Sequence, residues 1–431
     1  MSGDRRPIKR QNRPEIQSSP RLDELPVWPE HVRGGSLVRI LQRHVQSLRD
    51  EEAHGNRQLF LDDVFVVQLL AFFNPTIRSL RVIEDFSQCR QVQRHLSVTR
   101  ICKSTLSDFH KLAAPERLQP IIEALRAQIG TRTHPNDIPK DWLELLNKVI
   151  AVDGTFLPAL AKVAWAVKNR NQQGTQSYRA RLDFHVDVHS WIPDLIVVPE
   201  PGETESRTAT RTVTPGLIHV YDRGFFSFEL IAAHYVPASI EMNVLADFVI
   251  RLKEEGSNAP TLETMEERSL SDAAREAFVV SDRWVRLPGF TKNQKREIVV
   301  REVVIQLPDS SRIRLLTSLL DLPAEIIGLL YRWRWQVELF FKWLKCYANF
   351  THLISTTEDG VLLQFYVAII GVLLMYLHTS TRPSKYMLML LGLVAQGSAS
   401  LDEIIPILRE RERQNELARQ SAARRRAKKQ S

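Results

Sequence analysis

Residues Tyr331–Lys345 read YRWRWQVELFFKWLK and predict the helix around which the other elements are interpreted. It contains neither glycine nor proline, and Pro323 just upstream is typical of the first turn of a helix. At about 100° per residue, four side chains share one helical face roughly 60° wide: Tyr331, Arg334, Glu338 and Lys345. One carboxylate is thus displayed among two cations and a phenol. Such a face suits a metal ion beside phosphate groups, but it is equally typical of the solvated side of an amphipathic helix.

The spacing of these four residues resembles the Tyr-Arg-Glu-Lys signature of bacterial DDE transposases of the fourth insertion-sequence family. The resemblance implies two aspartates upstream, each at the end of a strand, that complete a catalytic, metal-binding triad with Glu338. It also implies that Tyr331, Arg334 and Lys345 bind DNA.

Two apolar runs end in aspartate, at Lys148–Thr155 (KVIAVDGT) and Leu217–Gly224 (LIHVYDRG). Each run predicts a strand that carries a carboxylate at its tip. By itself each signal is weak, because aspartate is common before glycine in turns, and Asp222 can cap a helix at Phe225–His234. Together with Glu338 the two aspartates match the order that the resemblance requires. We therefore assign Asp153, Asp222 and Glu338 as the catalytic and metal-binding residues.

The resemblance implies a ribonuclease-H-like α/β core, in which adjacent strands bring the two aspartates together and a flanking helix supplies the glutamate. Arg181–Val188 alternates apolar and polar residues, which predicts a half-exposed antiparallel strand. Asp194–Val198 and Ala246–Lys253 predict two further strands. On and after the alternating strand, His185 and His189 are expected to be exposed residues rather than ligands.

The stretch between Asp222 and Glu338 is longer than one strand and one helix require, so we expect a β-rich insertion there. Three ranges predict its strands: 278–287, 297–307 and 312–317. Relatives of this family use an insertion tryptophan to stack on a flipped base, which makes Trp284 a candidate for contact with DNA. A core tryptophan fits Trp284 as well.

Residues 36 to 130 predict helices throughout, with strong segments at 59–73, 79–91 and 118–129. Between them, Ser97 and Ser104 are expected to cap short helices. A helix-turn-helix, whose second helix at Ser104–Leu112 enters a DNA groove, and a plain helical bundle both fit. Thr131–Lys140 is polar and rich in proline, which predicts a linker.

Charge and composition favour a polyanionic partner in a reducing compartment. The formal net charge is +8, and Arg409–Ser431 holds nine Lys or Arg residues against three Glu, so this tail carries most of it. The tail is either solvated or a non-specific phosphate clamp. The three cysteines have no metal-ligand spacing, and the first twenty residues lack the apolar core of a signal peptide. Val361–Leu377 and Tyr386–Ala395 are apolar but fall short of the ~20 residues that span a bilayer, which predicts buried helices.

From the sequence and the resemblance we expect an α/β protein with a ribonuclease-H-like catalytic core, a β-rich insertion, an all-helical N-terminal DNA-binding domain and a helical C-terminal region. The expected divisions are a disordered basic lead-in at 1–34, a helical domain that binds DNA ends at 35–130, the first part of the core at 141–253, the insertion at 254–320, the catalytic helix at 321–350, the helical region at 351–408 and the basic tail at 409–431.

The resemblance implies a cut-and-paste DNA transposase of an insertion sequence that cleaves phosphodiester bonds and transfers strands with two Mg²⁺ ions, or Mn²⁺ as a substitute. Its expected partners are double-stranded DNA, as terminal inverted repeats and target, and a second copy of the chain in a paired-end complex. We expect no membrane contact and a bacterial, cytoplasmic, nucleoid-associated protein. Two alternatives stay open: a ribonuclease-H-like nuclease without strand transfer, and a domesticated protein that binds DNA without cutting it.

Overall fold

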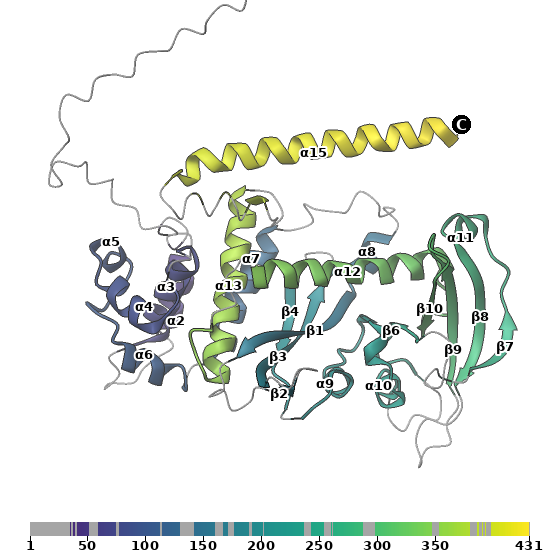
Figure 1. The fold of residues 1–431 in the computed structure, drawn as a ribbon, viewed down its shortest axis with the longest axis horizontal. Coiled ribbons are helices and arrows are strands. Elements are labelled where there is room, and N and C mark those ends of the chain that lie inside the picture. The colour runs from purple at the N-terminus through teal and green to yellow at the C-terminus, as the bar shows by residue number, and fades with distance from the viewer. Residues whose placement is uncertain are drawn as a thin grey trace, which may run out of the picture.

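One mixed β-sheet runs through the part of the chain that the structure describes (Figure 1). The structure is a computed structural model. It describes residues 41–50, 59–74, 77–112, 114–129, 142–159, 167–170, 176–188, 192–200, 202–236, 243–253, 262–287, 298–346, 353–379 and 398–430, with single positions at 35, 38, 260, 386, 387, 390 and 393. The expected lead-in (1–34), the expected linker (131–140) and His189 lie outside these residues.

The centre of the sheet is β1 (Val149–Ala159), which pairs antiparallel with β3 (Gln176–Asp187) and parallel with β5 (Ile218–Tyr221). β5 in turn pairs parallel with β6 (Asp247–Arg251). Two more strands lie antiparallel to β3: β2 (Val167–Arg170) and β4 (Ile192–Val197). The strands expected near residues 194 and 246 are therefore confirmed.

The remaining strands extend this same sheet. They are β7 (Glu263–Glu267), β8 (Val279–Leu287), β9 (Ile298–Gln306) and β10 (Arg312–Thr317). β10 pairs antiparallel with β6, so the sheet runs on without interruption through β10, β9, β8 and β7. The three strands expected in the insertion are confirmed. Pairing of β10 with β6 joins these strands to the central sheet, and the bounds of the expected insertion at 254–320 stay a prediction.

Two long helices lie against one face of the sheet. α12 (Ala324–Cys346) crosses β1, β5, β6, β8 and β9, as Figure 1 shows. Its start is anchored by Arg301 of β9, which is 1% exposed and donates to both carboxylate oxygens of Asp282 at 2.7 and 2.8 Å. The same guanidinium donates to the carbonyl oxygens of Leu319, Leu320 and Leu322 in the turn before α12. A buried ion pair with its remaining donors satisfied fixes the point from which the helix departs.

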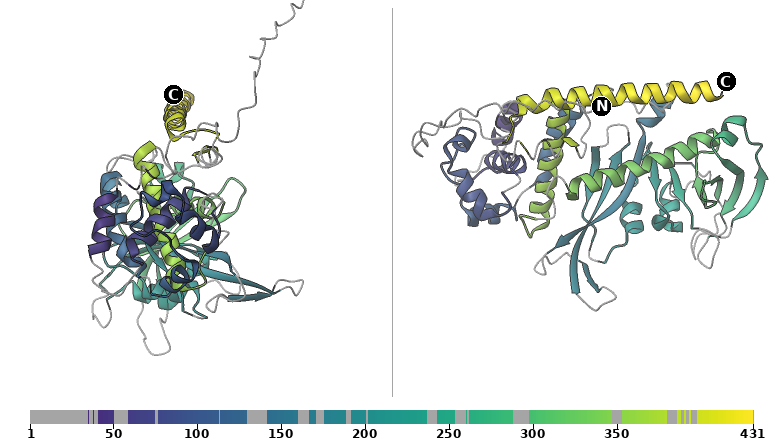
Figure 2. Two further views of the ribbon diagram at one scale, coloured as in Figure 1. Left: turned by 90° about the vertical axis from the view of Figure 1, so that its left-hand side faces the viewer. Right: turned by 45° about the horizontal axis from the view of Figure 1, so that its top comes forward.

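The second long helix, α13 (Glu358–Thr379), stands between the N-terminal helices and the sheet (Figures 1 and 2). The sequence predicted an apolar segment too short to span a bilayer. The predicted length is wrong, because the helical window Glu358–Leu377 is long enough and apolar enough, by length and composition alone, to span a bilayer. However, 89% of this window is buried inside the protein, so the expectation of a buried core helix is confirmed.

Side-chain alternation along β1 and β5 creates two apolar layers, since successive residues of a strand point to opposite faces. Val149 and Ala151 pack in the layer that contains α12 and α13. Ile150 and Val152 pack in the opposite layer. That layer is completed by α9 (Glu205–Arg211) and α10 (Phe228–Ala233). Both faces of the central sheet are thus covered.

This second layer corrects the expectation that β3 is half exposed. Asp183 and His185 lie on the predicted polar face of β3, yet each is only 2% exposed. His185 is not a surface residue: its Nε2 shares a hydrogen bond of 3.0 Å with the hydroxyl of Thr212 at the end of α9. Burial lowers the pKa of His185 to about 4. The pattern of β3 was polar because its partners on α9 are polar, and not because solvent covers it.

The regular elements that the structure describes in the N-terminal part are all helices, as expected. Its helices are α2 (Gln42–Asp50), α3 (Leu61–Phe72), α4 (Leu80–Ser87), α5 (Arg90–Gln93), α6 (Lys103–Phe109), the 3-10 turn η1 (Pro115–Leu118) and α7 (Gln119–Ile129). The expected caps are wrong. Ser97 donates to Asp63 of α3, and Ser104 lies inside α6, whose N-cap is Cys102. Arg100 is ion-paired with Glu84.

The N-terminal helices share the hydrophobic core of the sheet. α3 and α7 both pack on α13, and their apolar residues belong to the same cluster as β1 and α12. A Cβ at Gly371 of α13 would lie 2.5 Å from the ring of Phe72, so glycine is what lets α3 approach this closely. Arg126 of α7 also pairs with Asp187 and Asp194 at 2.8 and 2.6 Å. The apolar core is therefore continuous across the expected division at residue 130.

The expected basic tail is part of a long helix. α15 (Leu401–Gln430) begins with Ile404, Ile405 and Leu408, which are buried, and it then runs along the rim of the molecule (Figure 1). Arg409, Arg411 and Arg413 follow on its exposed part. Whether its charge contacts DNA stays a prediction.

Candidate active site

Strand pairing brings Asp153 and Asp222 together. The parallel register of β1 and β5 ends with Val152 opposite Tyr221, and each aspartate is the next residue. Because side chains alternate, Asp153 follows Val149 and Ala151 onto the face that α12 covers, and Asp222 follows Ile218 and Val220 onto the same face. The expectation of two carboxylates on adjacent strands is therefore confirmed in its geometry.

One detail of that expectation is wrong. β1 does not end at Asp153 but continues to Ala159, because it stays paired with β3 after it leaves β5. Asp153 thus sits in an extended strand whose backbone is held on one side only, and not in a turn. Asp222 follows β5 directly and precedes the short turn η3 (Arg223–Phe225), which it does not cap with its side chain. The nearby helix α10 is capped by Ser227 instead.

α12 places Tyr331 and Arg334 against the two aspartates. The Tyr331 hydroxyl donates to Asp222 Oδ1 at 2.9 Å. Arg334 Nη1 donates to Asp153 Oδ2 at 3.4 Å, and its Nη2 lies 4.0 Å from Asp222 Oδ1. Tyr331 is 4% exposed and Arg334 is 3% exposed. For these two residues the alternative of a solvated helix face is wrong, and one guanidinium bridges both carboxylates.

Glu338 lies on α12 four residues, about one turn, after Arg334. Residues with this separation share a helix face, so the backbone of α12 directs position 338 toward the same side of the helix. The side chains of Glu338 and Lys345 lie outside the described part of the structure. Their roles stay predictions.

The two aspartates differ in their electrostatics. Burial raises the pKa of Asp153 to about 7, and the neighbouring Glu205 and Asp222 act in the same direction, against Arg334 and the Gly154 N–H. Burial also raises the pKa of Asp222. For that residue, Arg334, the Arg223 N–H and the Tyr331 hydroxyl together outweigh burial, and the net pKa is lowered. Without a cation, Asp153 is thus partly protonated near neutral pH, while Asp222 stays ionised.

A further carboxylate, Glu205, lies beside this pair and was missed by the sequence analysis. It belongs to the first turn of α9, on the other face of the sheet from α12. A Cβ at Gly154 would lie 2.5 Å from Glu205 Oε1, and a Cβ at Gly224 would lie 3.9 Å from Oε2. Burial raises the pKa of Glu205, Arg181 opposes this, and Asp222 adds to the effect of burial, so the net pKa is raised. No local signal could have found this residue, because only the packing of α9 brings it to the strand ends.

Trp284 lies on β8, which is separated from β5 by β6, β10 and β9 in the order of the sheet. The guanidinium of Arg268 lies 5.4 Å from the centre of its ring. Its indole nitrogen is buried, and no described group accepts its hydrogen bond. Stacking of Trp284 on a base stays a prediction.

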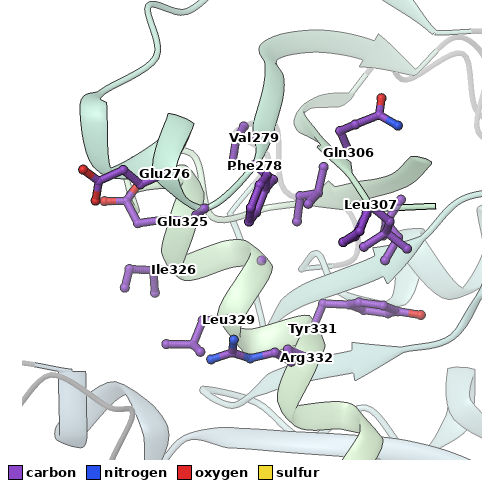
Figure 3. Close-up of a pocket in the computed structure, with 15 residues that line it drawn as sticks. Glu276, Phe278, Val279, Gln306, Leu307, Glu325, Ile326, Leu329, Tyr331 and Arg332 are labelled. Atoms are coloured by element: carbon purple, nitrogen blue, oxygen red, sulfur yellow. The ribbon is translucent and has the colours of Figure 1, made fainter. Parts of the chain in front are cut away.

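A cavity of about 570 Å³ lies beside the first half of α12 (Figure 3). Phe278, just before β8, and Val279, at its start, line the cavity. Ile305 of β9 also lines it, as do Leu329 and Tyr331 of α12. Phe278 has a left-handed backbone (φ 62°) and is 62% exposed. Tyr331 thus borders this cavity and also donates to Asp222.

The aspartate pair suits a divalent cation. Oxygen ligands are those that Mg²⁺ and Mn²⁺ prefer. In this structure the Arg334 guanidinium lies where both carboxylates stabilise positive charge. Among the side chains that the structure describes, no three Asp, Glu, His or Cys residues come close enough to hold an ion. The third expected ligand, Glu338, has a side chain outside that set.

Comparisons with known proteins agree on one family. The family model described as Transposase DDE domain matches residues 145–374. A protein of Sinorhizobium fredii (strain NBRC 101917 / NGR234) named transposase y4zB is 26% identical over 224 residues, which cover 51% of this chain and 58% of that protein. A Geobacillus stearothermophilus protein named for transposition of insertion sequence element IS5377 is 32% identical over 164 residues, which cover 38% of this chain and 40% of that protein.

A third relative, from Synechocystis sp. (strain ATCC 27184 / PCC 6803 / Kazusa), is named as a transposase for insertion sequence element IS4SA. It is 24% identical over 284 residues, which cover 64% of this chain and 71% of that protein. The chain thus spans less than two thirds of the length of the first two relatives. Among solved structures, a piggyBac transposase synaptic complex with hairpin DNA matches with a TM-score of 0.39 and 9% identity, over 87% of this chain and 82% of that one.

Proposed function

Because the chain belongs to the family of transposase DDE domains, we propose that it is a DNA transposase that cleaves phosphodiester bonds and transfers the cut strand. The observation that carries the proposal is the pair Asp153 and Asp222, which lies on adjacent parallel strands and is bridged by Arg334. Glu338 follows Arg334 by one turn of α12 and completes the proposed triad. The relatives named as transposases of insertion sequences support the same activity.

The proposed core is ribonuclease-H-like. Strand β1 pairs antiparallel on one side and parallel on the other, and the two carboxylates lie where the parallel pairing ends. α12 crosses the same face and carries position 338. This arrangement supports the expectation that adjacent strands supply two acids and a flanking helix supplies the third.

Asp153, Asp222 and Glu338 would hold two divalent cations, Mg²⁺ in the first instance, with Mn²⁺ as a substitute. When bound, such a pair stabilises the attacking and leaving oxygens of an in-line phosphoryl displacement. Family membership implies a need for divalent metal, while the kind and number of ions belong to this proposal.

The residues of α12 prepare the site. Arg334 compensates the charge of Asp153 and Asp222, so that two acids can lie buried side by side. Its second role is to bind a phosphate once a cation takes over that compensation, and Lys345 would bind another. The Tyr331 hydroxyl donates a hydrogen bond to Asp222 and so fixes the orientation of that carboxylate.

The proposed partner is double-stranded DNA, first as the terminal inverted repeats of the element and then as target. The helices at 35–130 would recognise the ends, Trp284 would stack on a base, and a second copy of the chain would hold the other end in a paired complex. The basic residues of α15 would add contacts with phosphates that depend on salt.

The test uses the full chain and DNA that carries the repeats bracketing its reading frame. Asp153→Ala, Asp222→Ala and Glu338→Ala should each abolish Mg²⁺-dependent cleavage, by at least a hundredfold, and leave binding to the ends within about twofold in a gel shift. Asp272→Ala removes a 95% exposed carboxylate on α11 (Asp272–Glu276) and should cleave normally. Cleavage without joined products on paired ends would identify a nuclease, and a triad variant that still cuts would remove that residue from the triad.

A further inference from the structure

Glu205 reaches the aspartate pair through a gap in the strand. Gly154 comes directly after Asp153, and its missing side chain leaves the space that the Glu205 carboxylate enters from the face of α9. With any side chain at 154, the Cβ would lie 2.5 Å from Glu205 Oε1, closer than atoms can pack. Gly224, two residues after Asp222, lies at the other oxygen. The carboxylate therefore lies between the residues that follow the two aspartates.

The first turn of α9 is held firmly in this position. Arg181 of β3 is 7% exposed, and it donates to the Glu203 carbonyl at 2.6 Å and to the Thr208 hydroxyl at 2.8 Å. Its third partner is Asp183, at 3.0 Å. The hydroxyl of Ser206 shares a hydrogen bond of 2.6 Å with Ser227, which begins α10. Residues on both sides of Glu205 are thus fixed to neighbouring elements.

Glu205 itself has no such structural partner. Among the described residues no hydrogen bond or ion pair involves its carboxylate, although the residue is partly buried. Burial raises the pKa of Glu205, the Arg181 guanidinium lowers it, and Asp222 raises it by a smaller amount, so the net pKa is raised. A partly buried carboxylate without a hydrogen-bond partner is unfavourable, and the attraction of Arg181 relieves this only in part. The contacts of Arg181 and Ser206 therefore hold α9 where the ionised form of Glu205 is still disfavoured, and a nearby cation would stabilise it.

We propose that Glu205 supports the cation site from the α9 face: in this structure it does not lie close enough to Asp153 and Asp222 to share an ion with them, but its charge strengthens the binding of divalent metal by these two aspartates. This inference rests on the proposed cation site. Glu205 would act as a positioning residue, through the negative charge that it holds beside the two aspartates. Acids in such a position commonly change metal affinity by about 10–100-fold.

The experiment is calorimetric titration of the metal-free full chain with Mn²⁺, so that the readout is affinity and not activity. Glu205→Gln should raise the Kd for Mn²⁺ by about 10–100-fold. Glu229→Gln is the matched control, because Glu229 also lies in the first turn of a short helix, α10, but is exposed. It should bind Mn²⁺ as the wild type does. Glu205→Asp keeps the charge on a shorter side chain and should recover part of the affinity.

Asp153→Asn separates the inference from the proposal on which it rests. If Asp153→Asn weakens Mn²⁺ binding and Glu205→Gln does not, Glu205 has no role toward the cation, and the proposed function stands. If neither variant weakens binding, the cation site itself is refuted, and the inference with it. Should Glu205→Gln fail to fold by circular dichroism, Glu205→Asp decides: wild-type affinity together with wild-type stability would overturn the inference, and weaker binding by a folded variant would support it.

Discussion

Replacing Asp153 by asparagine should stabilise the metal-free protein, because the site holds this carboxylate at a cost. Its pKa is about 7 in the folded state against an ordinary value of 3.8, and burial is the main cause. A group whose pKa rises on folding contributes stability that is fully present below pH 3.8. That stability falls as the pH rises from 3.8 and is lost once the pH has passed about 7. Asparagine has the same shape and no charge, so it escapes that loss.

The size of the effect follows from the two pKa values. One pKa unit corresponds to about 1.4 kcal/mol, so Asp153→Asn should gain about 0.5 kcal/mol at pH 4, about 3 kcal/mol at pH 6 and about 4 kcal/mol at pH 8. The side chain is 20% exposed, so solvent screening reduces these values only modestly. An amide cannot accept from both Gly154 and Arg334 as the carboxylate does, which offsets the gain by about 1 kcal/mol.

The assay is urea unfolding in the presence of EDTA, with both proteins measured at each pH from 4 to 8. Other titrating groups, such as the buried His185, His219 and His234, contribute equally to both proteins and cancel in the difference. Asp222→Asn is the matched control with opposite sign, because the pKa of Asp222 is lowered and its ionised form is favoured in the fold. If the free energy of unfolding of Asp153→Asn does not exceed that of the wild type by an amount that grows with pH, then burial does not raise the pKa of Asp153 more than Arg334 lowers it, and the reasoning fails.

Three further outcomes are expected. Arg334→Ala should cost about 1–3 kcal/mol of unfolding free energy in EDTA, because both aspartates lose their cation, while its Mn²⁺ affinity by calorimetry should equal or exceed that of the wild type; weaker binding of Mn²⁺ would contradict this account. Gly154→Ala should cost about 1–3 kcal/mol in the same unfolding assay and weaken Mn²⁺ binding, since its methyl group meets Glu205 and Asp183; unchanged stability and affinity would show that the gap is not needed. Removal of residues 1–130 should expose α13, which α3 and α7 cover, and leave a chain without a cooperative melt by circular dichroism; a sharp melt would show that the core folds alone.

Local patterns were sufficient for the elements that carry the site. The runs before Asp153 and Asp222 are β-branched and short, and they form β1 and β5. The stretch around Tyr331 and Arg334 lacks helix breakers and forms α12. Periodicity also placed these two side chains on one face of the helix, which the contacts with the aspartates confirm.

Features that depend on distant partners were not predictable in the same way. The polar side chains of β3 were expected to face solvent, yet α9 buries Asp183 and His185. The sequence also did not indicate how the strands of 254–320 join the core, whereas in the structure β10 pairs with β6 and continues the central sheet. Ser97 was expected to cap a helix, yet it bonds to Asp63 of α3.

Local sequence was enough to specify the strands and the helix that carry Asp153, Asp222 and position 338, because propensity and periodicity act over a few neighbouring residues. Which polar groups meet depends on tertiary packing: Arg334 lies against both aspartates, and Glu205 lies at the gap left by Gly154. The same local pattern of polar residues fits a side chain hydrated by water and one bonded to a distant residue. The packing of α9 and α12 on opposite faces of one sheet chooses between them.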